Sequence, residues 1–287
     1  MNKLSFSGHD TFTCRQFWLK KGLDHVWAER KFDDDAVIEL GVGRNMVNSI
    51  KYWVNAFGLI NDENPTILAE KLFNSKDGFD PYLEDINTLW LLHYNLVTTE
   101  VASIYSMVFN EFRRLKIEFT REMLNDFILK SCERLGEKNT NSRTVEKDIG
   151  VFILNYALPE TSKGIESDFS GLLYELNLLT RLERSGKEKW YKIENTSRKT
   201  LGARIALFCI LYNANGDTTF SFKDLLDKEN SIGRVFALSA NGLYDKIQEF
   251  VQAYPEHLTF TDNAGVKVLQ ITKELDCWTV LKDYYEA

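Results

Sequence analysis

The sequence is poor in proline and lacks a long apolar run. Only 4 of its 287 residues are proline and no tract is of low complexity, so extended disorder is not expected. No stretch of about 18 consecutive apolar residues exists, which excludes a transmembrane helix. The N-terminal sequence MNKLSFSGHD becomes polar too early for a signal peptide. We therefore expect a cytoplasmic protein that makes no membrane contact.

Cysteine is equally scarce, and its positions are scattered. The four cysteines are Cys14, Cys132, Cys209 and Cys277, and no two of them form a C-x-x-C pair. This spacing argues against a structural zinc site and against a disulfide framework. We predict buried free thiols, with no metal ion and no cofactor.

Basic residues do not dominate the chain. Lys and Arg number 35 against 42 Asp and Glu, for a net charge of -7, which argues against a protein that coats DNA. The charge is uneven, however, because residues 181–204 carry eight basic and three acidic side chains, whereas residues 205–287 carry seven basic and twelve acidic ones. One local basic face is enough to bind a duplex, and the acidic C-terminal third suits a protein partner.

The predicted fold is mainly α with short β-hairpins (α+β), built from several winged-helix-like modules around a central helical core. The linker-like stretch LPETSKGIESD separates an expected N-terminal domain, 1–160, from a C-terminal domain, 161–287, that contains two such modules. The sequences SGKEKWYKI and LTFTDNAGVKVLQI predict hairpins. Thr66 and Thr120 are expected helix caps, as is Ser142 or Thr144. Four acids, Asp77, Asp80, Glu84 and Asp85, lack the spacing of a calcium loop and predict a capped helix start instead.

Residues 36–60, AVIELGVGRNMVNSIKYWVNAFGLI, predict a helix-turn-helix. A short apolar helix leads into Gly-Val-Gly, and a second helix follows at once. Its apolar side carries Met46, Val47, Ile50, Trp53, Val54 and Phe57. The residues expected to face a duplex are Arg44, Asn45, Asn48, Lys51 and Tyr52, whose long polar side chains suit base edges and phosphates. An ordinary helical hairpin is the alternative, and the motif alone does not separate the two.

A second candidate contact is the basic hairpin that follows residue 180. Arg181, Arg184, Lys187 and Lys189 form a basic run that continues to Lys192, with Trp190 and Tyr191 interleaved. This hairpin could therefore hold phosphates or stack on a single-stranded base. A solvated hairpin without a ligand is the alternative, because most charged runs are simply exposed surface.

His9, Asp10 and Arg15 form the cluster that most resembles an enzyme site. Histidine acts as a general base and aspartate can set its tautomer, which leaves a nuclease or hydrolase as a third hypothesis. Adjacent residues rarely point at one atom, and no nucleophile is placed beside them. A buried polar cluster that holds the N-terminal segment on the core is the preferred interpretation.

Four segments together resemble an uncharacterised bacterial family of unknown function, the four-thousand-and-seven series of such domains. They are FSGHDTF with the following WLKKG, LGVGRNMVNSIKYWVNAFGLI, DGFDPYLEDINTLWLLHYNL and DNAGVKVLQI. Genes of this family often lie beside genes for phosphoadenosine-phosphosulfate-reductase-like proteins, in clusters linked to DNA phosphorothioation and phage defence. The resemblance implies an accessory protein of DNA modification or defence, and it supplies no catalytic residue.

The leading prediction is therefore a non-enzymatic protein that binds double-stranded DNA in a modification or phage-defence system. The alternative is an adaptor that docks a sulfur-transfer enzyme or a helicase without touching DNA itself.

Overall fold

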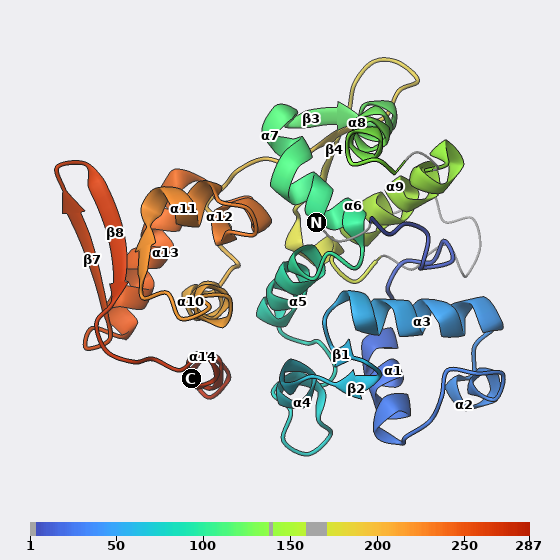
Figure 1. The fold of residues 1–287 in the computed structure, drawn as a ribbon, viewed down its shortest axis with the longest axis horizontal. Helices are drawn as coiled ribbons and strands as arrows, with labels where there is room; N and C mark the ends of the chain where they lie inside the picture. The colour runs from blue at the N-terminus through green and yellow to red at the C-terminus, as the bar shows by residue number, and fades with distance from the viewer. Residues whose placement is uncertain (1–3, 138–139, 159–170) are drawn as a thin grey trace. The chain divides into compact units, whose positions relative to one another are not determined.

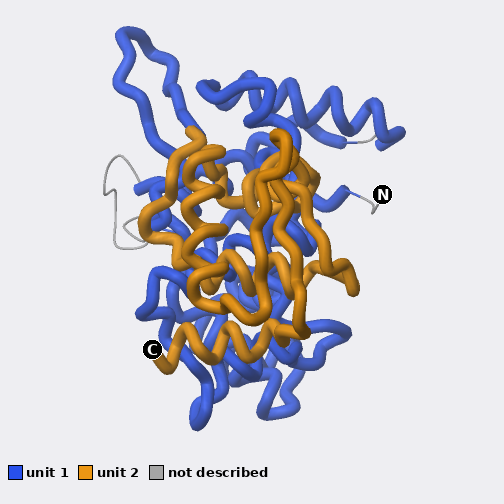
Figure 2. Tube along the Cα trace, turned by 90° about the vertical axis from the view of Figure 1, so that its left-hand side faces the viewer, with its two compact units in different colours: residues 1–193 blue, residues 194–287 orange. Residues whose placement is uncertain are grey.

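The computed structural model describes residues 4–137, 140–158 and 171–287. By their internal contacts the residues form two compact units, 1–193 and 194–287, which are blue and orange in Figure 2. The domain boundary expected at residues 160/161 lies outside the described residues. Each unit is taken by itself below.

The first part of unit 1 contains the predicted pair of helices and a very short hairpin (Figure 1). Its elements are α1 (Trp18–Trp27), α2 (Ala36–Leu40), α3 (Arg44–Ala56), β1 (Ile60–Asn61), β2 (Asn64–Pro65) and α4 (Ile67–Phe73). Gly41 ends α2 in the left-handed conformation, with φ of 62°, which glycine adopts without steric cost. Asp62 and Glu63 both have positive φ in the turn between β1 and β2, as a type I′ hairpin turn requires. Thr66 caps α4, as predicted, by accepting from the amide of Ala69.

The core of unit 1 is built on α5 (Ile86–Thr98), which is buried on all sides from Asn87 to Val97. Asp85 caps this helix, and the buried Asp80 accepts from the amides of Glu84 and Asp85. The acids before α5 therefore act as a capped helix start, as predicted. The chain continues through α6 (Ser103–Ser106), the π-helical turn η1 (Met107–Phe112) and α7 (Arg113–Leu115).

The last part of unit 1 joins distant segments in one sheet. Its elements are β3 (Glu118–Thr120), α8 (Arg121–Arg134), α9 (Ser142–Tyr156), the 3-10 turn η2 (Tyr174–Leu176), β4 (Thr180–Leu182) and β5 (Trp190–Lys192). Thr120 caps α8 as predicted, but Asn141 caps α9 in place of Ser142 or Thr144. The strand order is β3-β5-β4. The β4–β5 hairpin, expected with the C-terminal residues, belongs to unit 1, because a lone hairpin is marginally stable and this one pairs with β3.

Unit 2 repeats that connectivity with longer strands. Its elements are α10 (Ala203–Tyr212), β6 (Thr219–Ser221), α11 (Phe222–Asp227), α12 (Ile232–Val235), α13 (Ala240–Ala253), β7 (Leu258–Asn263), β8 (Val266–Ile271) and α14 (Cys277–Tyr285). The predicted hairpin forms β7 and β8, with Ala264 and Gly265 at positive φ in its turn. The order is β6-β8-β7. In both three-stranded sheets, a first strand leads into helices, a hairpin follows, and the last strand lies in the middle.

The fold class is thus the predicted one, mostly helical with small antiparallel sheets. All four cysteines are free, and Cys14, Cys132 and Cys209 are buried as expected. Burial raises the pKa of the Cys14 and Cys209 thiols well above the usual value. Within the described ranges, no helix is long and apolar enough to cross a membrane.

Candidate nucleic-acid interface

Helix α3 divides into an apolar face and a polar face, as its sequence predicts. Val47, Ile50, Trp53 and Val54 are fully buried against the rest of unit 1. The opposite face carries the five predicted contact residues, of which Arg44, Asn45 and Asn48 are exposed and Lys51 and Tyr52 are half-buried. Burial of the apolar face fixes the helix, so the polar face is presented outward by a rigid element.

The polar face of α3 borders a groove whose other wall is the β1–β2 turn. The groove has a volume of about 470 Å³, and its lining residues are Asn48, Lys51, Tyr52, Asn55, Ile60, Asn61, Asp62 and Glu63. Three side-chain amides and one tyrosine therefore face a single hollow, and amides of this kind pair with base edges. Asn61 was missed by sequence reasoning, since a two-residue strand shows no periodicity that would mark it.

Three polar side chains of α3 are each held by an acid from another segment. Arg44 Nη1 lies 2.7 Å from Asp34 Oδ1, and Lys51 Nζ lies 2.6 Å from Glu63 Oε1. Asn48 Nδ2 donates to Asp10 Oδ2 at 3.4 Å. The hydrogen bond and charge of Lys51 lower the pKa of Glu63, so this acid is ionised at neutral pH. We call Asp10, Asp34 and Glu63 the acidic fringe of α3.

The N-terminal loop, residues 7–11, packs against α3 at the half-buried Tyr52. Ser7, Asp10 and Thr11 all have positive φ, a conformation that costs energy in non-glycine residues. A Cβ atom added to Gly8 would come within 2.3 Å of the Tyr52 ring. Burial raises the pKa of Tyr52, as does the charge of Asp148. The loop is therefore shaped to fit against α3.

His9 is the buried centre of that loop and does not pair with Asp10. Its ring is 2% exposed and stacks on Trp53, with centroids 5.8 Å apart. Nδ1 accepts from the amide of Thr11 at 3.2 Å, which assigns the ring proton to Nε2 in the neutral form. Nε2 lies 3.3 Å from Oδ1 of Asp148 in α9, without the geometry of a hydrogen bond.

Asp148 completes the connection between the loop and α9. It is 2% exposed, and its oxygens accept from the amide of Ser7 at 2.9 and 3.1 Å. Arg15, the third member of the predicted cluster, is not part of this contact, and its Cζ lies 5.2 Å from the centre of the Trp18 ring. His9 therefore lies in a buried contact between the N-terminal loop and α9.

The basic hairpin is a separate surface. Arg184 pairs with Glu118 and lies over Trp190, with Cζ 4.1 Å from the ring centre. Arg181 is half-buried, whereas Lys187 and Lys189 are exposed. In Figure 1, β4 lies with β3 and α8 in one half of unit 1, and α3 lies with α1 and α2 in the other. The structure therefore does not merge the two predicted contacts into one patch.

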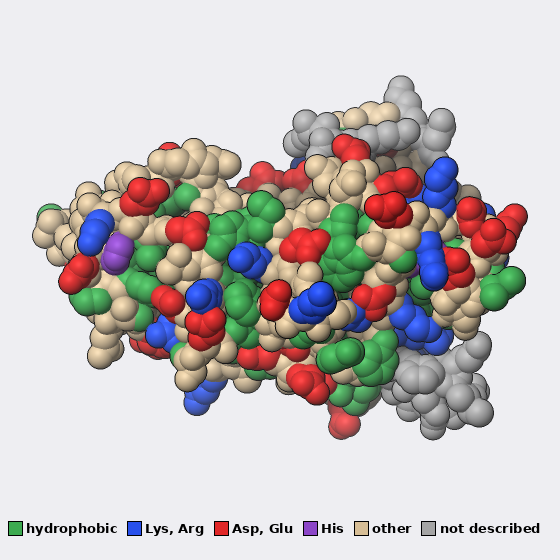
Figure 3. Space-filling view, turned by 90° about the horizontal axis from the view of Figure 1, so that it is seen from below, with side chains coloured by type: hydrophobic (Ala, Val, Ile, Leu, Met, Phe, Trp, Pro, Cys, Tyr) green, Lys and Arg blue, Asp and Glu red, His purple; other side chains and the backbone are tan. Residues whose placement is uncertain are grey.

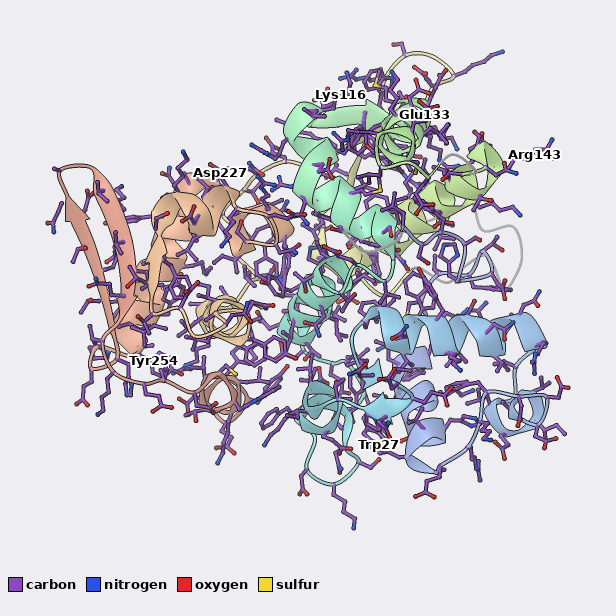
Figure 4. All side chains as sticks on the ribbon, in the orientation of Figure 1. Trp27, Lys116, Glu133, Arg143, Asp227 and Tyr254 are labelled. Carbon is purple, nitrogen blue, oxygen red and sulfur yellow. The ribbon has the colours of Figure 1, made fainter. Side chains whose placement is uncertain are left out.

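The charge on these surfaces is mixed. In Figure 4, Lys116 and Glu133 are labelled in the upper part of unit 1 and Trp27 in its lower part. On the face drawn in Figure 3, acidic, basic and apolar side chains are interspersed.

The described residues offer little to a metal ion. Across residues 4–137, 140–158 and 171–287, no group of three or more His, Cys, Asp or Glu side chains could hold one.

Fold and site together define a helical α+β protein whose outward polar helix ends at a short hairpin. The chain belongs to a family described as a protein of unknown function, DUF4007, whose model matches residues 6–285. It is similar to a protein named SspB in two crystal structures. One is 26% identical with a TM-score of 0.84, and the other, a magnesium ion-bound form, is 27% identical with a TM-score of 0.86. Each alignment covers 99% of this chain and 88% of that one. No curated protein matches the chain.

Proposed function

We propose that the protein is a DNA-binding accessory factor of a bacterial DNA-modification or phage-defence system of the phosphorothioation type. The observation that carries the proposal is the polar face of α3, which stands outward on a fixed helix beside the β1–β2 turn. Arg44 and Lys51 would contact phosphates, and Asn45 and Asn48 would contact base edges. The exposed Lys187 and Lys189 would hold phosphate on the second surface.

The connectivity of the sheets supports this proposal. A strand, then helices, then a hairpin whose second strand lies in the middle of the sheet is the order of a winged helix, and both three-stranded sheets have it. The α2–α3 pair followed by β1 and β2 is a shorter version with a two-strand sheet. Helix-turn-helix proteins place the second helix of such a pair in the major groove. In this chain α3 is the second helix of the pair.

The family adds the biological context. The resemblance of the motifs to a family from phosphorothioation and defence gene clusters, the family match, and the similarity to SspB all concern nearly the whole chain. The resemblance implies a setting of DNA modification or defence, and a polar face on a rigid helix is compatible with reading DNA in that setting. A cytoplasmic location follows from the same proposal.

The double variant Arg44→Ala/Lys51→Ala tests the proposal directly. We expect up to about tenfold weaker duplex binding, because two phosphate contacts are lost, and a salt slope reduced by at most about 1.8, the value reached when both cations contact phosphates in the wild type. Fluorescence anisotropy of a labelled duplex, titrated at several salt concentrations, measures both quantities.

Lys273→Ala/Lys282→Ala is the matched control. Both lysines lie in unit 2, are exposed, and pair with acids, as Arg44 and Lys51 do. The control changes net charge by the same amount and should leave the salt slope within error. Equal affinity and equal slope for the wild type and the α3 variant would remove the proposal.

An adaptor role is the second candidate, and the surface of α13 favours it. The exposed residues along this helix include no Lys or Arg; besides two alanines they are Asn241, Tyr244, Asp245, Gln248, Glu249 and Gln252. The Tyr244 ring meets Phe260 edge-on at 5.8 Å. An acidic, partly aromatic face repels phosphate and suits a basic segment of a protein partner, such as a phosphoadenosine-phosphosulfate-reductase-like enzyme or a helicase.

Tyr244→Ala/Asp245→Lys tests that second role. We expect about tenfold weaker capture of a co-expressed phosphoadenosine-phosphosulfate-reductase-like protein, because one aromatic anchor is lost and one charge is reversed. Tyr212→Ala, which alters another exposed tyrosine of unit 2, should leave capture unchanged. If the wild-type chain captures neither this enzyme nor a helicase from the same gene cluster, the adaptor role fails.

A further inference from the structure

The acidic fringe of α3 comes from three segments that are separate in the sequence. Asp10 belongs to the N-terminal loop, Asp34 precedes α2, and Glu63 lies in the β1–β2 turn. Each places a carboxylate oxygen on a different polar side chain of α3, at 3.4, 2.7 and 2.6 Å. Three independent loops therefore supply negative charge to the same helix face that would meet DNA.

Stability does not account for these contacts. Arg44 and Asp34 are 48% and 96% exposed, and Lys51 and Glu63 are 44% and 70% exposed. Exposed ion pairs of this kind contribute little to folding, because water and salt screen them and because two flexible side chains lose freedom. We therefore ask how these ion pairs affect a ligand, such as DNA, that approaches the surface of α3.

A phosphate that approaches α3 meets two cations, Arg44 and Lys51, that are already paired with carboxylates. The distances of 2.7 and 2.6 Å are those of charge-assisted hydrogen bonds, so a carboxylate already neutralises each cation and takes one of its N–H donors. Binding then exchanges one anion for another and brings the phosphate close to the displaced carboxylate. A contact with the DNA backbone alone therefore gains little binding free energy from this exchange.

A site that also offers base edges is not penalised in the same way. The amide of Asn45 lies on the exposed part of α3, and Asn48 and Asn55 line the groove. Their contacts with bases add favourable energy that a random sequence does not supply. Acids beside the reading face can therefore widen the difference between the right site and all others.

We propose that Asp34 and Glu63 are specificity-determining residues, which suppress sequence-independent duplex binding by α3. The inference rests on the proposed function, because it assigns these acids a role at the same face. The turn that carries Glu63 has positive φ at Asp62 and Glu63, and in this turn the carboxylate lies 2.6 Å from Lys51 Nζ.

The isosteric double variant Asp34→Asn/Glu63→Gln tests the inference. It keeps side-chain size and removes two negative charges. We expect at least tenfold tighter binding to a duplex of random sequence and a salt slope steeper by up to about 1.8, because Arg44 and Lys51 become available to phosphates. Anisotropy titrations with one labelled random duplex measure both changes, and circular dichroism checks the fold.

Glu256→Gln/Glu286→Gln is the matched control. These acids are exposed and pair with Lys273 and Lys282 in unit 2, and the control shifts net charge from -7 to -5, as the test variant does. It is expected to change affinity less than twofold. Equal gains in the two double variants would mean that only net charge matters, and that outcome overturns the inference.

The remaining outcomes separate the inference from the proposed function. If Arg44→Ala/Lys51→Ala weakens binding and Asp34→Asn/Glu63→Gln binds as the wild type does, the inference fails and DNA binding by α3 stands. If no variant binds a duplex, both fail. Tighter binding by the amide variant that disappears when Arg44→Ala and Lys51→Ala are added supports the inference.

Discussion

Replacing Asp148 with alanine is expected to lower the free energy of unfolding by about 3 kcal/mol, because the Ser7 amide loses its acceptor and the buried His9 ring loses the carboxylate beside it. The carboxylate accepts from the Ser7 amide through both oxygens and lies 3.3 Å from Nε2 of His9. With alanine at this position, a buried ring nitrogen and the amide face a cavity instead. Urea denaturation followed by circular dichroism measures the change.

Two further variants show whether this loss is specific to Asp148. Asp148→Asn keeps one acceptor oxygen and should lie between alanine and the wild type. Asp126→Ala removes an exposed acid from α8 and should stay within about 0.5 kcal/mol of the wild type. The loop at residues 7–11 should also become more sensitive to protease in Asp148→Ala. A loss no larger than that of Asp126→Ala would mean that Asp148 does not hold the loop.

Local signals in the sequence predicted the elements that determine their own conformation. The periodicity of α3 separated its buried face from its exposed face, and the Asn263–Gly265 turn predicted the β7–β8 hairpin. Thr66 and Thr120 predicted helix starts because a hydroxyl beside a free amide is a local effect. Sequence reasoning therefore predicted those elements whose conformation is determined by residues close together in the chain.

Contacts between distant segments were not predictable in the same way. Ser7 and Asp148 are 141 residues apart, and no periodicity links a loop to one carboxylate on a remote helix. The pairing of β5 with β3 is another case, since three-residue strands contain too little pattern to specify a partner. For this reason the sequence did not indicate that the β4–β5 hairpin pairs with β3.

The candidate interface shows both results at once. The sequence indicated which side chains of α3 point outward, and Arg44, Asn45 and Asn48 are exposed. It did not indicate that Asp34 and Glu63 form ion pairs with Arg44 and Lys51 on that face. Charge counts along the chain average over such pairs, so an apparently basic contact can be locally neutral.

Gly233→Ala is expected to destabilise unit 2 by about 3 kcal/mol, at the upper end of the usual cost of overpacking. A Cβ atom at this position would lie 2.3 Å from the carbonyl oxygen and 2.5 Å from the Cα of Leu226. Both are backbone atoms at the end of α11, so no side chain can turn away. The helices α11 and α12 would have to separate, which exposes the buried Leu225 and Val235.

Gly150→Ala is the matched control for this substitution. Gly150 lies inside α9, and a Cβ atom there would meet nothing within 4 Å, so alanine should raise stability by about 0.5 to 1 kcal/mol through its higher helix propensity. Thermal unfolding of both variants measures the change in stability, which should be negative for Gly233→Ala and positive for Gly150→Ala although the same methyl group is added. Because α3 belongs to unit 1, Gly233→Ala should also keep duplex binding below its melting temperature. Loss of duplex binding in a still-folded Gly233→Ala protein would instead assign the DNA contact to unit 2.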